Sequence, residues 1–153
     1  MAPVKAMNGT SLLVQIGDGN VDPGPEVFAH DCLINAERGI QFAAETNRQT
    51  IPDCETPDAL AWQSLSKDGL TATITGGGML HTTSVPDWFA WFDSDDAKNV
   101  RALLNGVAAA DGGGHWAGAF KLTGFEVTGE RNNKATVSVT LESDGAVTWV
   151  DAT

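Results

Sequence analysis

The sequence has 153 residues and a large excess of acids, with 20 Asp and Glu against 9 Lys and Arg and a net charge of −11. This length fits one domain with a substantial core, spanning residues 1–153. The charge disfavours stable binding to nucleic acids or anionic membranes, because both carry negative charge themselves. No apolar run in the sequence approaches the roughly 20 residues that a membrane-spanning helix needs.

The first ten residues lack a basic stretch followed by an apolar one, so we expect no secretory signal and a protein that is cytosolic when made. Residues 1–10 are expected to form a flexible N-terminal arm. In this compartment the two cysteines should stay reduced. We expect one of them, Cys32, to be a small core residue and the other, Cys54, to lie in a loop.

Apolar residues alternate with period two along most of the chain, which is typical of strands with one buried face. In residues 135–141 the alternation places three side chains inward, namely Val137, Val139 and Leu141. Similar patterns predict inward-facing Leu70, Ala72 and Ile74, and inward-facing Ile40, Phe42 and Ala44. The predicted strands cover residues 11–17, 27–34, 39–46, 70–75, 116–131 and 135–141. The Asn132–Asn133 pair predicts a hairpin turn before the last of them.

One segment departs from this period and predicts a short α-helix over residues 85–93. Ser84 and Asp87 resemble a capping box, and Pro86 suits the first turn. An apolar stripe at helical spacing consists of Val85, Trp88, Phe89 and Phe92. Residues 100–104 fit either a helix or a strand by their pattern alone.

Residues 47–64 show no sustained period and contain two prolines, so they are expected to form a long loop. Two glycine triplets, at residues 76–78 and 112–114, are expected to be flexible turns. Neither triplet is followed by Lys-Ser or Lys-Thr, as a phosphate-binding loop would be.

No group of residues has the spacing of a catalytic or metal site. The histidines His30, His81 and His115 are scattered, and a lone histidine rarely makes a site. The acids that follow the predicted helix lack the central Gly and terminal Glu of a calcium loop. We therefore expect a protein that is not an enzyme and has no metal site or cofactor; a hydrolase is the weakest alternative.

The chain has five tryptophans and no tyrosine. Exposed tryptophan can stack on sugar rings, so a carbohydrate-binding β-sandwich is one alternative. A place in the core or at a subunit interface is favoured, because tryptophan is enriched in both. Trp91 flanks the apolar stripe of the helix and is a candidate for contact with a neighbouring subunit.

Four segments, in this order, resemble the bacteriophage major tail tube protein family of long-tailed phages and prophages. They are IPDCETPD with the following Trp62 (residues 51–62), VPDWFAWF (85–92), GHWAGAFKLTGFEVTGER (114–131) and VSVTLESDGAVTW (137–149). The resemblance favours a strand over residues 100–104. It implies an antiparallel β-sandwich or barrel with one flanking helix, and a virion structural protein assembled in the bacterial cytoplasm.

The resemblance further implies hexameric rings that stack into a tube around a channel, through which DNA passes without sticking. Implied partners are other copies, a tape-measure protein, a tail terminator and distal tail or baseplate proteins. The long loop and both termini, including residues 144–153 as a C-terminal arm, would mediate ring-to-ring contact. Interface candidates on this basis are Ile51, Pro52, Asp53, Glu55, Pro57, Trp62 and Trp91. A tube protein of a bacterial contractile injection or secretion device is the main alternative.

Overall fold

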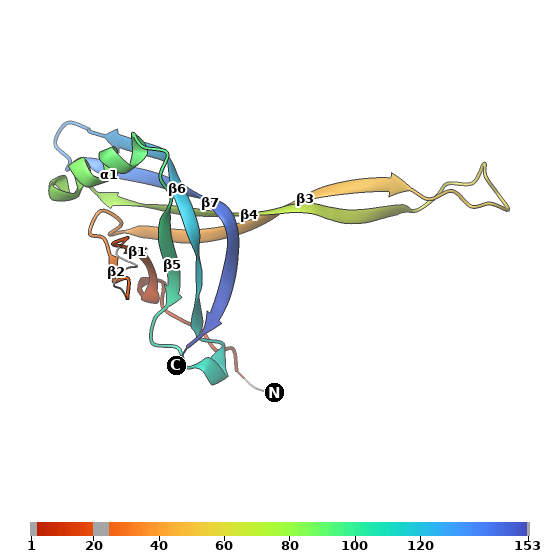
Figure 1. The fold of residues 1–153 in the computed structure, drawn as a ribbon, viewed down its shortest axis with the longest axis horizontal. Helices are drawn as coiled ribbons and strands as arrows, with labels where there is room; N and C mark the ends of the chain where they lie inside the picture. Colours follow the sequence, from red (N-terminus) through yellow and green to blue (C-terminus); the bar gives the residue numbers. More distant parts are fainter. Residues whose placement is uncertain (1–2, 20–24, 153) are drawn as a thin grey trace.

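The computed structural model describes residues 3–19 and 25–152, whose strands form one antiparallel seven-stranded sheet (Figure 1). The order across the sheet is β2-β1-β5-β6-β7-β4-β3. The elements are β1 (Leu12–Gly17), β2 (Phe28–His30), β3 (Glu37–Thr50), β4 (Gln63–Met79), α1 (Val85–Phe92), β5 (Lys98–Leu104), β6 (Gly114–Thr128) and β7 (Thr136–Asp151). In this described part of the chain, no helix is long and apolar enough to cross a membrane.

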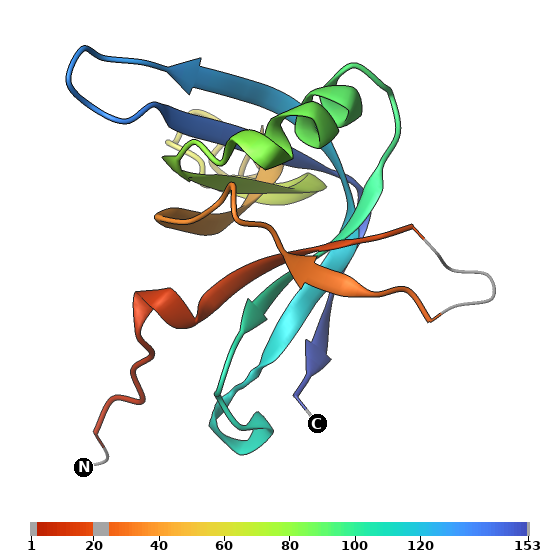
Figure 2. The same cartoon turned by 90° about the vertical axis from the view of Figure 1, so that its left-hand side faces the viewer.

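The sheet curls so that strands far apart in its order enclose one core (Figure 2). Val14 of β1 and Ile74 of β4 are each 1% exposed and belong to the same apolar cluster, although three strands separate β1 from β4. Helix α1 lies over this core and adds Trp88 and Trp91 to it. The predicted fold, mainly antiparallel β with one short flanking helix, is confirmed.

Several local predictions are confirmed by the strands. Residues 100–104 lie within β5, so the ambiguous segment is a strand. The alternation in β7 buries Val137, Val139 and Leu141, at 4%, 1% and 0% exposure. The turn before β7 has Asn132 at φ 72°, a left-handed conformation that asparagine tolerates better than most residues.

The strand predicted over residues 27–34 is too long, because β2 ends at His30. Asp31 ends it by accepting a hydrogen bond from the backbone N–H of Leu33 at 2.8 Å. The chain then turns, and Leu33 and Ile34 are both fully buried, which consecutive residues of a strand with one wet face cannot be. This turn also leaves Cys32 exposed, contrary to its predicted place in the core.

The predicted long loop is wrong over part of its length. β3 continues through Thr50 and β4 begins at Gln63, so the connection is residues 51–62. Both extensions carry polar residues on an exposed hairpin, where backbone pairing continues without an apolar alternation to reveal it. The predicted C-terminal arm is likewise mostly strand, because β7 runs to Asp151.

The glycine triplet at residues 76–78 is not a turn but part of β4; all three glycines pair with β7, and Gly76 and Gly77 also pair with β3. Its role is close packing. A Cβ atom on Gly76 would lie 2.6 Å from Cγ2 of Ile34, and one on Gly77 would lie 2.7 Å from the carbonyl oxygen of Val137. The second triplet is a turn as predicted until Gly114, which begins β6.

Helix α1 begins where predicted and ends one residue earlier, at Phe92, but its buried face differs from the predicted stripe. Trp88 and Trp91 are buried, whereas Phe89 and Phe92 are 55% and 43% exposed. The Ser84 side chain makes no capping hydrogen bond, because a 3-10 turn, Thr82–Ser84, leads directly into the helix. Periodicity alone does not determine how α1 is rotated on the sheet.

Candidate assembly surfaces

The most prominent surface feature is a two-stranded arm that extends β3 and β4 away from the rest of the sheet (Figure 1). β7 pairs with β4 only from Thr73 to Met79, and the backbone N–H of Ala72 still donates to Ser143 Oγ of β7, so residues 63–71 have β3 as their one neighbouring strand. The eight residues 43–50 of β3 give the arm roughly 27 Å before its tip, at about 3.4 Å per residue. We call residues 43–71 the arm and residues 51–62 its tip.

The tip has local order of its own. The backbone N–H of Ile51 donates to the carbonyl of Trp62 at 3.2 Å and so continues the ladder into it. The Asp53 carboxylate accepts from the backbone N–H of Glu55 and from the hydroxyl of Thr56, each at 3.0 Å. These hydrogen bonds, that from Glu55 first, lower the pKa of Asp53.

The tip exposes large apolar side chains. Leu60, Trp62 and Ile51 are 102%, 91% and 61% exposed, respectively. They surround a shallow hollow of about 430 Å³. An apolar group of this kind, held at the end of a long arm, has the character of a contact site for another macromolecule.

The structure brings six of the seven predicted interface residues together and separates the seventh. The six lie in the tip: Ile51, Pro52, Asp53, Glu55, Pro57 and Trp62. Trp91 lies instead in the core, 4% exposed, with its ring centroid 5.5 Å from that of Trp88. Its indole N–H donates to the carbonyl of Asp96 at 2.9 Å, and Lys98 Nζ lies 5.1 Å from its ring centroid. Trp91 is therefore satisfied within its own subunit.

A second apolar surface, the outward side of α1, was not predicted from the sequence. Phe89 and Phe92 are three residues apart and adjacent on the helix, and both are exposed. The sequence did contain a hint of this surface. A helix of eight residues with four large aromatic side chains cannot turn all of them toward one sheet.

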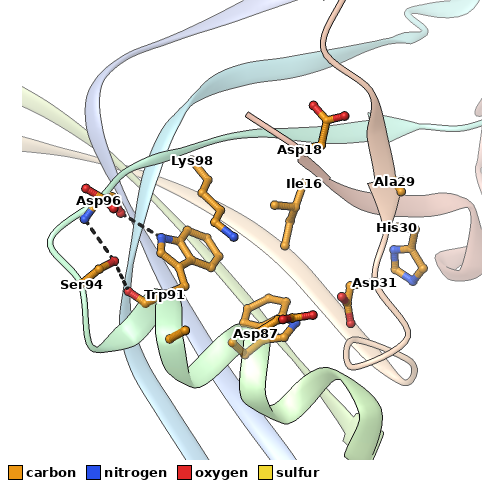
Figure 3. A pocket seen from close by; sticks show the side chains of 12 residues that line it. Ile16, Asp18, Ala29, His30, Asp31, Asp87, Trp91, Ser94, Asp96 and Lys98 are labelled. Carbon is orange, nitrogen blue, oxygen red and sulfur yellow. Dashed lines mark hydrogen bonds between the residues drawn. The ribbon is translucent and has the colours of Figure 1, made fainter. Parts of the chain in front are cut away.

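A pocket of about 640 Å³ lies between α1 and the β1–β2 hairpin (Figure 3). Its walls include Ile16, Trp88 and Trp91, and four carboxylates lie around it, those of Asp18, Asp31, Asp87 and Asp96. Within residues 3–19 and 25–152, no three His, Cys, Asp or Glu residues are grouped closely enough to hold a metal ion.

The histidine in this pocket has a structural role. His30 Nδ1 lies 3.0 Å from the carbonyl oxygen of Val14, and its Nε2 lies 3.2 Å from Arg38 Nη1. Both ring nitrogens of His30 therefore have a hydrogen-bond partner within the fold. His30 therefore ties β2 to β1 and β3.

A third aromatic group lies where β3 leaves the body. The ring centroids of Phe42 and Trp116 are 5.3 Å apart, and those of Trp116 and Trp149 are 4.9 Å apart. Phe42 and Trp149 remain 49% and 40% exposed. Phe42 was predicted to face inward, and it does share the face of its buried partner Ala72 and pack on Trp116, but about half of its side chain remains exposed.

Charge on the body is arranged around α1. The segment 84–97 contains Asp87, Asp93, Asp95 and Asp96 and no Lys or Arg. Asp95 forms an ion pair with Lys121 on β6 at 3.1 Å, and its hydrogen bond raises the pKa of Lys121. On β6 the pKa of His115 is lowered, first by burial and then by the charge of nearby Arg101.

The fold is shared with tail tubes of known structure. A chain from the tail of an empty gene transfer agent particle, refined with C6 symmetry, has a TM-score of 0.71 and 21% identity, covering 95% of this chain and 99% of that one. A chain of the SPP1 tail tube has a TM-score of 0.63 and 8% identity, covering 96% and 80%. A chain of the sheath-tube complex of an extracellular contractile injection system has a TM-score of 0.57 and 14% identity, covering 96% and 93%.

Sequence comparison adds the family. No curated protein matches the chain. The family model described as phage tail tube protein matches residues 6–149, which include the arm, α1 and every strand except the last two residues of β7. The chain therefore belongs to the phage tail tube protein family.

Proposed function

We propose that this chain is the repeating subunit of a tail tube, in which hexameric rings stack around a channel that DNA traverses. The observation that carries the proposal is the arm, which holds exposed apolar side chains far from the folded body of the subunit. In a monomer the apolar side chains of Leu60 and Trp62 are exposed to water, which is unfavourable, whereas contact with a neighbouring ring would bury them. Membership of the tail tube family supports the same role.

The negative charge suits the channel role. Nine Lys and Arg against 20 Asp and Glu make the chain repel DNA on balance, so a passing genome would not be retained by counterion release at the wall. The role is structural, with no catalytic step. Its partners would be further copies of the chain, a tape-measure protein, a tail terminator and distal tail or baseplate proteins, in a virion assembled in the bacterial cytoplasm.

A tube subunit of a contractile injection device is the second candidate. The fold likeness to the sheath-tube complex of such a system favours it. The two candidates differ in what surrounds the tube. Binding of purified tubes to a sheath protein from the same genome would favour the injection device, whereas a tape-measure protein inside the tube would favour the phage tail.

The test is electron microscopy of the purified protein and of a variant without the tip. In the variant, residues 52–61 are replaced by Asn-Gly, which closes the ladder at Ile51 and Trp62 with a two-residue turn. We expect the wild type to form tubes of uniform diameter, and the variant to remain folded and form rings that do not stack. Cys54→Ser, which changes one exposed atom of the same tip, is the control and should form tubes.

Two results would contradict the proposal. A wild-type protein that stays monomeric at high concentration would argue against any tube. Tubes of normal length from the variant without the tip would show that the tip has no part in stacking.

A further inference from the structure

One face of the arm's shaft differs from its reverse. Cross-strand partners share a face, and β3 alternates without interruption, so the face of Phe42 continues through Arg48. On β4 the register shift after Glu45 brings Lys67 and Leu65 opposite Thr46 and Arg48, on the same face as Leu70. We call this surface the shaft face. Its large apolar and basic members are Leu70, Lys67, Leu65 and Arg48, with Phe42 at the base of the arm, and the small residues Ala44 and Thr46 lie between them.

The shaft face is both apolar and cationic. Phe42, Leu65 and Leu70 are 49%, 50% and 76% exposed. Arg48 and Lys67 make no side-chain hydrogen bond or ion pair with any residue that the structure describes. The reverse of the shaft carries small or polar residues, including Asn47 and Ser66 opposite each other, and the acid Glu45. Backbone pairing in the shaft therefore does not depend on apolar or basic side chains. The concentration of such side chains on one face needs a different explanation.

The opposite side of the molecule has a complementary surface. Helix α1 lies at the end of the body away from the arm (Figure 1). We call the exposed residues on the two flanks of α1 the α1 face. Phe89, Phe92 and Asp93 lie on one flank, and the acids Asp87 and Asp96 lie on the other, where they line the pocket. The pocket with the carboxylate rim opens beside it (Figure 3).

The charges decide how these two faces can pair. Two shaft faces together would oppose cations, and two α1 faces would oppose carboxylates, and like charges at an interface are costly. Only a shaft face against an α1 face joins opposite charges and buries apolar side chains on both sides. Two different surfaces on opposite sides of one subunit form a head-to-tail contact, the kind that closes into a ring.

The dimensions also agree. Eight helical residues span about 12 Å, and the eight shaft residues of β3 span about 27 Å. The shaft is therefore long enough to contact both flanks of α1.

We propose that the shaft face of one copy docks on the α1 face of the next copy, and that this contact closes the ring. The inference rests on the proposed function, since it identifies the surfaces by which tube subunits meet within a ring. The occupant of each face is a second copy of this chain.

Two charge-reversed variants test the pairing. The shaft variant carries Arg48→Glu and Lys67→Glu, and the helix variant carries Asp93→Lys and Asp96→Lys. Lysines after the last turn of α1 suit the helix dipole, and all four positions are exposed, so both variants should fold. Circular dichroism and thermal unfolding check this first.

Sedimentation velocity and negative-stain microscopy then follow ring formation. We expect each variant alone to need at least about tenfold more protein than the wild type to form rings, which corresponds to about 1.4 kcal/mol. The equimolar mixture should recover, because the acidic shaft of one variant meets the basic helix of the other, and each unchanged face meets an unchanged partner. Rings that alternate the two variants are the expected product.

The control reverses nothing on either face. Asn47→Glu with Ser66→Glu adds two acids to the back of the shaft, one residue from the tested pair, and should assemble like the wild type. If both charge-reversed variants form rings normally, or if their mixture fails to recover, the pairing is wrong. A wild type that forms no rings at all would instead contradict the proposed function.

Discussion

The body and the arm are continuous along β3 and β4, yet they depend on different interactions. Ile74 has strands on both sides and is 1% exposed, whereas Leu70, four residues earlier on the same strand and face, has a neighbour on one side and is 76% exposed. The body is stabilised by burial of apolar surface. The arm has a backbone ladder but no core, so its apolar side chains are available to another subunit.

The largest expected effect is at Trp91, which tests whether the body encloses its aromatic residues. Trp91→Ala should lower the free energy of unfolding by about 3–5 kcal/mol, because it leaves a cavity beneath α1 and unpairs the Asp96 carbonyl. Urea denaturation measures the change. A small loss of stability with loss of ring formation would place Trp91 at an interface instead.

A pair of glycines compares the two regions more directly. Gly76→Ala should cost about 1–3 kcal/mol, because its Cβ would lie 2.6 Å from Ile34 in the packed body. Gly69→Ala in the arm should change stability by under about 0.5 kcal/mol, since its Cβ would meet only Glu45 Oε2, at 3.9 Å. Equal costs in thermal unfolding would show that the arm is packed like the body.

Trp62 tests the opposite property, an arm residue that matters only on assembly. Trp62→Ser should leave the free energy of unfolding of the monomer within about 0.5 kcal/mol, because its side chain is 91% exposed. Stacked tubes should be lost or shortened in electron micrographs. A large destabilisation of the monomer would mean that the tip folds back on the body.

The smallest expected effect is the change in stability at low pH, which should differ between His115 in the body and Asp53 in the tip. The pKa of His115 is below its ordinary value of 6.5 in the folded chain, so the neutral form is favoured by folding. Its contribution to stability is therefore present above about pH 6.5 and is lost as pH falls from there through the lowered folded pKa. Urea midpoints at pH 7.5 and 5.5 should differ less in His115→Gln than in the wild type.

Asp53 should respond in a lower pH range and only locally. Its pKa is lowered from 3.8 by hydrogen bonds within the tip, so the turn they form is kept above about pH 3.8 and lost as pH falls through the lowered value. Hydrogen exchange confined to residues 51–62 would follow this loss. An effect of Asp53→Ala on global unfolding would contradict the separation of tip and body.

Prediction from the sequence succeeded where the local pattern of apolar and turn-forming residues is enough to determine the structure. The alternation of Val137, Val139 and Leu141 followed from burial of one face, and the hairpin before it followed from the turn preference of asparagine. It failed at the arm, since exposed polar strands have no such alternation. It also failed at Gly76, because glycine marks turns and close packing equally well.

The interface candidates show the same division. The six interface candidates in the tip all lie within residues 51–62, so a single sequence segment grouped them. The shaft face combines residues from two strands across a register shift, and the α1 face depends on the rotation of a helix. Neither surface can be read from spacing, because both depend on which side the core occupies.

The sequence by itself determined the β-rich class, the bounds of the helix, the acidic character and the segment that forms the tip, since each depends on local composition or period. Only the tertiary structure decided which aromatic residues of α1 are buried, that the polar residues 47–50, 63 and 64 form strands, and which side of the arm is apolar and cationic. These features depend on contacts between segments far apart in the chain, above all where the curled sheet closes its core and where β7 stops pairing with β4.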